Sequence, residues 1–343
     1  MSYTVKSTEK LRKSCADMET KALLYLMNFR DDSDEIHYFV VDFFNDLTGM
    51  DRASSKLWDI QSKGASNSSP KSIGKELVTL YKNFLSDLTF SYLILFLGGV
   101  SNTVRNDNSK NLFGIDNVNS EAITKIVEGL KEESTDKTYI DSSQITTESI
   151  NSFLEKVLFV IDDKPPCDYV KAIIKDHPHI IPEEKVLNAI FNEIRNEQSS
   201  KKNGQVIEEL IISTSDEALN YYRHLTNNEI RLMTLQRIIN RDPVSQGFPL
   251  SFVPILNQCP PEKQKDMIDE CKGSLCRALF NKNVAHSFWS IFEHIYFLII
   301  NNPSDNVQDL YRKVDSTLIK KCPDFDTLSI KYFISVVKDG IQA

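Results

Sequence analysis

The sequence of 343 residues lacks the segments that direct a chain to a membrane. Its longest apolar run, residues 288–300, is interrupted by polar side chains and is shorter than the roughly twenty residues that a bilayer-spanning helix needs. The N-terminal stretch MSYTVKSTEKLRKS has no apolar core of the kind found in secretory signal peptides. We therefore expect a protein that neither spans a membrane nor carries a secretion signal.

Cysteine is scarce and irregularly spaced, with six residues in the whole chain. Without a secretion signal, this favours free thiols in a reducing cytoplasm over a disulfide framework. The one grouping that suggests zinc contains Cys271, Cys276, His286 and His294. Its C-x₄-C and H-x₇-H spacings do not match structural zinc sites, so buried thiols are the better interpretation.

Glycine-rich phosphate-binding motifs are also missing. Neither the G-x-x-x-x-G-K-[ST] loop nor the G-x-G-x-x-G or G-x-S-x-G motifs occur, so the chain is not itself a P-loop ATPase. No fixed internal repeat is found either, which argues against a regular solenoid.

Positive charge is not in excess, because 40 Lys and Arg face 48 Asp and Glu for a net charge of −8. This argues against a protein coated in positive charge, such as a chromatin protein. A local basic rim would still allow nucleic-acid binding. Residues 51–86 form such a window, with six basic and three acidic side chains.

Composition divides the chain into three parts. Dense apolar runs fill residues 1–100, and a stretch rich in Asn, Ser, Thr and Asp follows over residues 101–146. Residues 147–343 show almost only helical spacing. We predict an α/β N-terminal domain, a polar connector carrying one helix at 123–130, and an all-α C-terminal domain for sensing or oligomerisation.

The first hundred residues predict a helix, a strand hairpin, a loop, a helix and a strand. The first helix carries apolar residues at helical spacing from residue 11 to 25, and a buried strand over 36–44 runs on into 45–49. A turn near Ala53–Ser54 leads to an extended run over 57–63. Ser69 and Pro70 have the form of an N-cap and first helical position, and a final strand spans 90–97.

The hairpin places three functional side chains together. A turn near Ala53–Ser54 puts Asp46 opposite Gln61, and directly opposed residues share a face of the sheet. Lys63 lies on the same face as Gln61, because side chains alternate along a strand. Carboxylate and amide oxygens bind Mg²⁺ or Mn²⁺, and an ammonium neutralises charge developing on phosphorus. This set predicts phosphodiester hydrolysis.

The order of these elements, with Asp46 followed by Gln61-Ser62-Lys63, resembles the PD-(D/E)xK restriction-endonuclease-like superfamily. In particular, it resembles the nuclease domains of bacterial anti-phage defence effectors, in which Q-x-K often replaces D/E-x-K. The resemblance covers about residues 10–100 and implies an α-β-β-α-β core. It implies that Asp46 binds the metal, Gln61 is the second metal-site residue and Lys63 is the catalytic lysine. Glu19 matches an additional glutamate near the metal.

The sequence departs from the family pattern in three ways. No proline precedes Asp46, and Gln61 removes one charge from the metal site. Asp51, two residues after Gly49, is a rival for the metal-binding aspartate. The hairpin favours Asp46, because Asp51 would lie near the turn, opposite Lys56.

The expected substrate is DNA. Lys71 and Lys75, behind the loop 64–69, and Lys56 in the same basic window are the candidate phosphate contacts. The resemblance further implies a homo-oligomer and a separate activating or ATPase partner protein. Two alternatives stay open: a nuclease-fold interaction protein whose glutamine leaves the metal site too weak, and a nuclease acting on RNA.

Overall fold

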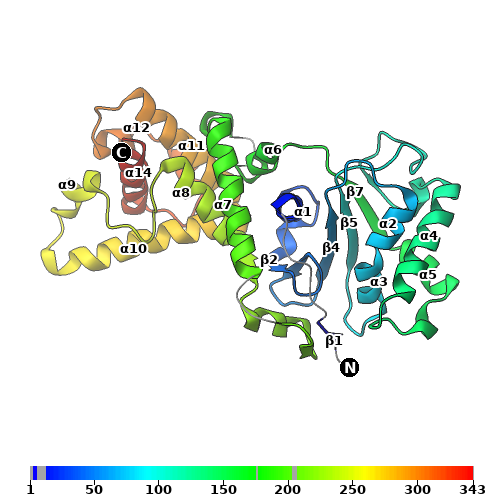
Figure 1. The fold of residues 1–343 in the computed structure, drawn as a ribbon. Helices are drawn as coiled ribbons and strands as arrows, with labels where there is room; N and C mark the ends of the chain where they lie inside the picture. The colour runs from blue at the N-terminus through cyan, green and yellow to red at the C-terminus, as the bar shows by residue number, and fades with distance from the viewer. Residues whose placement is uncertain (1–2, 6–12, 175–176, 203–206, 343) are drawn as a thin grey trace. The chain divides into compact units, whose positions relative to one another are not determined.

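The computed structural model describes residues 3–5, 13–174, 177–202 and 207–342 (Figure 1). The chain forms two compact units. The first comprises Met1–Tyr169 and Ile194–Asn227, and the second comprises Val170–Glu193 and Asn228–Ala343. Each unit therefore contains segments that are far apart in the sequence.

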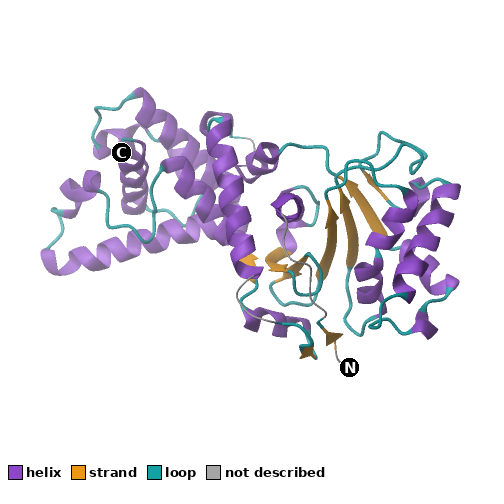
Figure 2. Ribbon diagram, in the orientation of Figure 1, coloured by secondary structure: helices purple, strands orange, loops and turns teal. Residues whose placement is uncertain are grey.

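A seven-stranded mixed sheet organises the first unit (Figure 2). Its strand order is β6-β7-β5-β4-β3-β2-β9. Strands β2, β3 and β4 pair in antiparallel fashion, whereas β5 is parallel to both β4 and β7. The bounds are β2 Ile36–Val41, β3 Leu47–Asp51, β4 Leu57–Lys63, β5 Tyr92–Leu97, β6 Leu112–Phe113, β7 Val157–Ile161 and β9 His224–Thr226. A separate ribbon pairs β1 (Tyr3–Thr4) with β8 (Ile211–Ile212).

Helices cover both faces of this sheet, which explains why β5 reads as a continuous apolar run (Figure 1). On one face α1 (Lys13–Asn28) packs against β3 and β4. The other face buries a large core beneath α2 (Pro70–Glu76), α3 (Val78–Leu85), α4 (Ser120–Thr135) and α5 (Thr147–Leu154). The predicted start of the first helix at residues 11–12 lies outside the described residues.

The strand predicted over residues 36–49 is divided in two by a tight turn. Asp42 has a left-handed backbone with φ 51°, and its N–H donates to the Asp46 carbonyl at 3.1 Å. The chain reverses there, so β3 lies between β2 and β4. The core therefore contains four strands, β2, β3, β4 and β5, where the predicted α-β-β-α-β order has three.

Glycine permits the close crossing of α2 and α4. A Cβ on Gly74 would lie 2.1 Å from the Ile126 carbonyl oxygen, and one on Gly129 would lie 2.2 Å from that of Lys71. The predicted N-cap is confirmed, since Ser69 Oγ accepts from the Ser72 N–H at 3.3 Å. The predicted helix behind it is two helices, with Leu77 between them.

The domain boundaries differ from those expected at residues 101 and 147. Helix α4 packs on α2, and β7 extends the sheet beside β5, so 101–161 belong to the first unit. Apolar residues of α5 and β7 together imitate one helical spacing, and short apolar runs do not distinguish strand from helix. For this reason the prediction that residues 147–161 are all helical was wrong, since β7 is a strand.

The second unit is helical. Rings of α11 and α14 meet in its core, where Phe333 stacks on Phe288 at 5.5 Å and lies 5.9 Å from Phe292. Phe297 and Ile300 of α11 remain half exposed. The helices that lie wholly or largely within this unit are α8 Asn227–Ile239, α9 Val253–Leu256, α10 Pro261–Phe280, α11 Ala285–Asn301, α12 Val307–Lys313, α13 Ser316–Lys320 and α14 Thr327–Ile341. Helices α6 (Pro166–Lys171) and α7 (Glu184–Lys202) span the boundaries between units.

Two further expectations concern absences. Within the described residues, no helix combines the length and the apolar character needed to cross a bilayer. The described cysteines, Cys167, Cys259, Cys271, Cys276 and Cys322, carry free thiols.

Candidate functional site

Asp46 and Gln61 meet where β3 begins and β4 nears its end. Strand pairing places Leu47 opposite Ile60, which continues to Asp46 opposite Gln61 as the hairpin predicts. Gln61 Nε2 donates to Asp46 Oδ2 at 2.8 Å. The same oxygen accepts from the Ser62 backbone N–H at 2.9 Å and from Ser62 Oγ at 3.0 Å. Three donors therefore fix the orientation of the Asp46 carboxylate.

The turn that carries Asp46 is anchored from outside the hairpin. Tyr3 OH and Asn83 Nδ2 both lie 3.2 Å from the Phe44 carbonyl oxygen. Within the turn, Asn45 Oδ1 accepts from the Asp46 N–H at 3.0 Å. The position of Asp46 therefore depends on β1 and α3 as well as on its own strand.

A second aspartate lies behind this anchor. Asp59 is wholly buried and accepts hydrogen bonds from Asn83 Nδ2 at 2.7 Å, Thr48 Oγ1 at 3.0 Å and Asn45 Nδ2 at 3.3 Å. Burial raises the pKa of Asp59 to about 7, although these donors oppose the shift. Asp59 is thus a titratable group linked to the Asp46 turn through Asn45.

Two buried cations face carboxylates close to Asp46. Lys202 Nζ lies 3.0 Å from Glu19 Oε1, and Arg223 Nη1 lies 3.3 Å from Asp42 Oδ2. Arg223 also donates to the Asp42 carbonyl at 2.9 Å. Helix α1 supplies Glu19, and the last residue of α7 supplies Lys202.

These carboxylates share one electrostatic environment. Burial raises the pKa of Glu19 to about 7 and that of Asp42 to about 6, while Lys202 opposes both shifts. The charge of Asp46 adds to both shifts, so all three acids interact. Three carboxylates against Lys202 and Arg223 leave one uncompensated negative charge when all are ionised.

This donor set fits Mg²⁺ in kind, since carboxylate and amide oxygens are the ligands that this ion prefers. The Asp46 and Glu19 carboxylates and the Gln61 carbonyl oxygen supply them. In the described part of the chain, no group of three or more acidic, histidine or cysteine side chains is placed to hold a metal ion. Glu19 would therefore have to exchange its contact with Lys202 for one with the ion.

Lys63 lies at the same end of β4 but is paired elsewhere. Its Nζ lies 3.1 Å from Glu76 Oε2 of α2. Along the strand, Lys63 is two residues from Gln61, or about 7 Å. Both side chains of the Lys63–Glu76 pair remain about one-third exposed. The structure thus brings Asp46 and Gln61 into contact and places Lys63 beside them, in an ion pair with α2.

Asp51 lies at the opposite end of β3, five residues or about 16 Å along the strand from Asp46. Its Oδ1 accepts from the Ser55 N–H at 2.6 Å and the Lys56 N–H at 2.9 Å. Its own N–H donates to the Lys56 carbonyl at 3.2 Å. Asp51 therefore closes the β3–β4 turn, apart from the Asp46–Gln61 contact.

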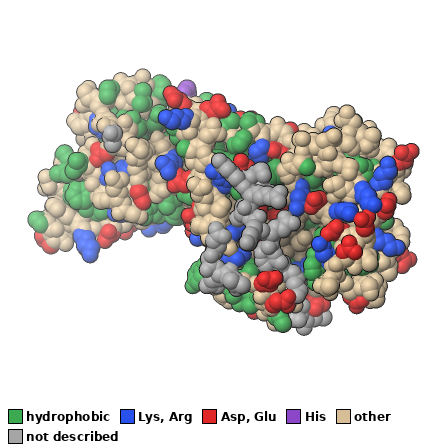
Figure 3. Space-filling view, in the orientation of Figure 1, with side chains coloured by type: hydrophobic (Ala, Val, Ile, Leu, Met, Phe, Trp, Pro, Cys, Tyr) green, Lys and Arg blue, Asp and Glu red, His purple; other side chains and the backbone are tan. Residues whose placement is uncertain are grey.

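The three lysines predicted to contact DNA each pair with an acid. Lys56 lies 2.7 Å from Glu35, whereas Lys71 and Lys75 lie 2.7 and 2.8 Å from Glu132 of α4. Figure 3 shows blue and red side chains side by side over the region of α2 and α4. Water screens exposed ion pairs of this kind, so a phosphate could replace the acid at little cost.

Comparison with known proteins gives no relative. No protein-family model matches the chain. Neither the curated proteins nor the solved structures contain a match.

Several residues of this site were not predicted from the sequence. Asp42 looked like part of a continuous strand, and Asp59 looked like one polar position among several in β4. The other missed residues lie far from the hairpin in sequence: Asn83 on α3, Lys202 at the end of α7 and Arg223 directly before β9. The one local signal was an aspartate within the apolar run 36–44, because a charge there implies a turn or a buried partner.

Proposed function

We propose that this chain is a metal-dependent nuclease with a restriction-endonuclease-like core, acting on DNA. The observation that carries the proposal is the hydrogen-bonded contact of Asp46 with Gln61 beside Lys63. Helix α1, the β3–β4 hairpin, α2 with α3, and β5 follow in the order that the resemblance implies. The additional strand β2 precedes the hairpin and does not interrupt it.

Asp46, the Gln61 carbonyl oxygen and Glu19 would hold the Mg²⁺ or Mn²⁺ ion. Such an ion, when bound, polarises a phosphate and lowers the pKa of a coordinated water. Ser62 orients Asp46 through its two hydrogen bonds. Lys63, released from Glu76, would neutralise charge on the phosphate oxygens.

The loop before α2 supports a role in phosphate binding because it is fixed beside Lys63. The Ser68 N–H donates to the Gly99 carbonyl at 3.1 Å, and the Ser101 N–H donates to the Ser68 carbonyl at 3.0 Å. A Cβ on Gly99 would lie 2.1 Å from the Ser66 carbonyl oxygen, so glycine allows this close approach. A nucleic-acid strand at Lys63 would meet an ordered loop.

The test is incubation of supercoiled plasmid and of a structured RNA with the protein in Mg²⁺ or Mn²⁺. We expect nicking or linearisation of DNA by the wild type and at least a hundredfold loss for Asp46→Asn and for Lys63→Ala. The matched control is Asp87→Asn, because this exposed aspartate lies after α3 and outside the site. Retained cleavage by Lys63→Ala would refute its assignment, and cleavage of RNA alone would refute the substrate.

One observation favours a second function, that of an interaction protein with an inactive nuclease fold. Lys202 and Glu76 satisfy the charges of Glu19 and Lys63 without a metal ion. Calorimetric titration with Mn²⁺ separates the two functions. Millimolar or tighter binding that Asp46→Asn abolishes supports the nuclease, and the absence of such binding supports the interaction protein.

The resemblance also supports a biological setting. We infer that the protein acts as an effector in bacterial anti-phage defence, with the second unit serving sensing or self-association. A homo-oligomer and a separate activating or ATPase partner belong to this proposal. Light scattering of the purified chain tests whether it forms a homo-oligomer, and a monomer at micromolar concentration would contradict that inference.

A further inference from the structure

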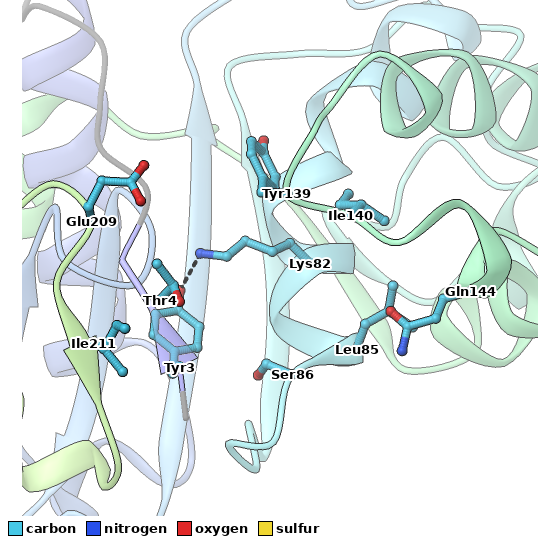
Figure 4. A pocket seen from close by; sticks show the side chains of 10 residues that line it. All are labelled: Tyr3, Thr4, Lys82, Leu85, Ser86, Tyr139, Ile140, Gln144, Glu209 and Ile211. Carbon is cyan, nitrogen blue, oxygen red and sulfur yellow. Dashed lines mark hydrogen bonds between the residues drawn. The ribbon is translucent and has the colours of Figure 1, made fainter. Parts of the chain in front are cut away.

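A cavity of about 430 Å³ opens in the first unit, and of its lining residues Tyr3 also anchors the Asp46 turn (Figure 4). Strands β1 and β8 and the segment before β8 line one side, and α3 with the segment after α4 lines the other. Pockets that bind small molecules have volumes of about 300–1,000 Å³. This volume exceeds what a single ion or amino acid requires.

One cation and two aromatic rings lie in this cavity. Lys82 reaches from α3 towards β1, where its Nζ donates to Tyr3 OH at 2.8 Å and lies 4.3 Å from the Tyr3 ring centre (Figure 4). The Tyr139 ring, half-buried on the opposite wall, lies 6.0 Å from the same Nζ. An ammonium beside an aromatic ring accommodates an anionic group attached to a flat ring.

The remaining polar groups add hydrogen-bond capacity. Glu209 is exposed on the β8 side and is the one acid among the lining residues. Its backbone is left-handed, with φ 63°, and its N–H donates to the Val5 carbonyl at 3.0 Å. A non-glycine residue in this conformation is uncommon and is often found at binding sites. Glu209 accepts from hydroxyl or amino groups, and the Gln144 amide both donates and accepts.

We propose that this cavity binds a nucleoside monophosphate, with the phosphate at Lys82, the base on Tyr139 and ribose or amino donors at Glu209. A free phosphate would use Lys82 alone and leave most of the volume unfilled. A zwitterionic amino acid would satisfy Lys82 and Glu209 but would not need the aromatic wall. The lining favours the nucleotide because it uses all three features.

A bound nucleotide would also act on the Asp46 turn. Tyr3 OH accepts from Lys82 and lies 2.8 Å from Asn83 Oδ1, whereas Asn83 Nδ2 lies 3.2 Å from the Phe44 carbonyl. Tyr3 has one hydroxyl proton, which it can donate either to Asn83 Oδ1 or to the Phe44 carbonyl oxygen. If Lys82 turns from Tyr3 to a bound phosphate, the balance between these two hydrogen bonds changes. The consequence for cleavage rests on the proposed nuclease function, whereas binding to the cavity does not.

The experiment is calorimetric titration of the full chain with AMP, adenosine, inorganic phosphate and glycine. We expect AMP to bind at least tenfold more tightly than any of the other three. Lys82→Met should weaken AMP binding about tenfold, the effect of losing one charge-assisted contact. Lys125→Met, an equal loss of charge on the exposed face of α4, should leave AMP binding within twofold of wild type.

Tyr139→Leu provides a second test that keeps every charge. It should weaken the binding of AMP and of adenosine several-fold and leave phosphate binding unaffected. Circular dichroism shows whether Lys82→Met and Tyr139→Leu fold. The proposal is overturned if the wild type does not bind AMP, or if it binds phosphate or glycine as tightly as AMP. It is also overturned if Lys82→Met and Tyr139→Leu both bind AMP as tightly as the wild type does.

Hydrogen exchange tests the link to the turn without using activity. Saturating AMP should change the exchange rates of the backbone amides at residues 42–46 in wild type and not in Lys82→Met. Unchanged rates in wild type would refute the link. Because these measurements use no substrate, an inactive nuclease would not affect their outcome.

Discussion

Replacing Asp59 with asparagine should change how stability depends on pH. The Asp59 carboxylate is wholly buried, and it accepts hydrogen bonds from the neutral side chains of Asn83, Thr48 and Asn45. Burial raises its pKa from the usual 3.8 to about 7. Asparagine has nearly the same shape and cannot ionise, so Asp59→Asn removes the titration and retains the packing.

The sign follows from proton linkage. A raised pKa means that the folded state holds the proton more tightly than the unfolded state, so Asp59 favours folding at low pH. This contribution is complete below about pH 4 and is lost as the pH rises to about 7. Three pKa units at 1.36 kcal/mol each correspond to about 4 kcal/mol.

Urea unfolding of wild type and Asp59→Asn between pH 4.5 and 8.5 measures this directly. We expect the stability of the variant relative to wild type to rise by about 3–4 kcal/mol over this range and to level off above pH 7. Glu19 and Asp42 also titrate here, but they occur in both proteins and cancel in the difference. Asp87→Asn, on an exposed side chain, should show no such rise. Parallel pH profiles for wild type and Asp59→Asn would refute the reasoning.

Two further predictions test other parts of the first unit. Lys202→Met leaves the Glu19 carboxylate buried without its cation, so unfolding in urea should show a loss of about 3–5 kcal/mol at pH 8. The loss should be smaller at pH 5, where Glu19 is protonated, and equal losses would contradict this account. Gly129→Ala places a Cβ 2.2 Å from the Lys71 carbonyl oxygen and should cost about 1–3 kcal/mol in thermal unfolding. Gly247→Ala, with nothing within 4 Å of its Cβ, is the control, and similar melting of the two variants would refute the close crossing.

Much of the first unit could be predicted because its signals are local. The alternation of side chains along β4 and the turn predicted near Ala53–Ser54 were enough to place Asp46 opposite Gln61. The position of Asp51 beside the turn followed from the same register. A strand has a fixed period, so once a turn is located the facing residues are determined.

Other features could not be predicted because they depend on partners distant in sequence. The reversal at Asp42 relies on Arg223, which bonds its carbonyl across 181 positions. In the sequence, the residues of β7 resemble a continuation of α5, and their strand conformation depends on pairing with β5. Lys63 carries the same charge wherever it lies, and only the placement of α2 pairs it with Glu76.

The sequence by itself determined the alternation of apolar and polar residues, the helix caps and the hairpin register, since these depend on neighbours a few positions apart. Tertiary structure alone decided which charges are buried together. Lys202 reaches Glu19 across 183 positions, and Asn83 reaches Asp59 across 24. Desolvation and Coulomb interactions act through space, so the raised pKa of Glu19 exists only once α1 and α7 are packed.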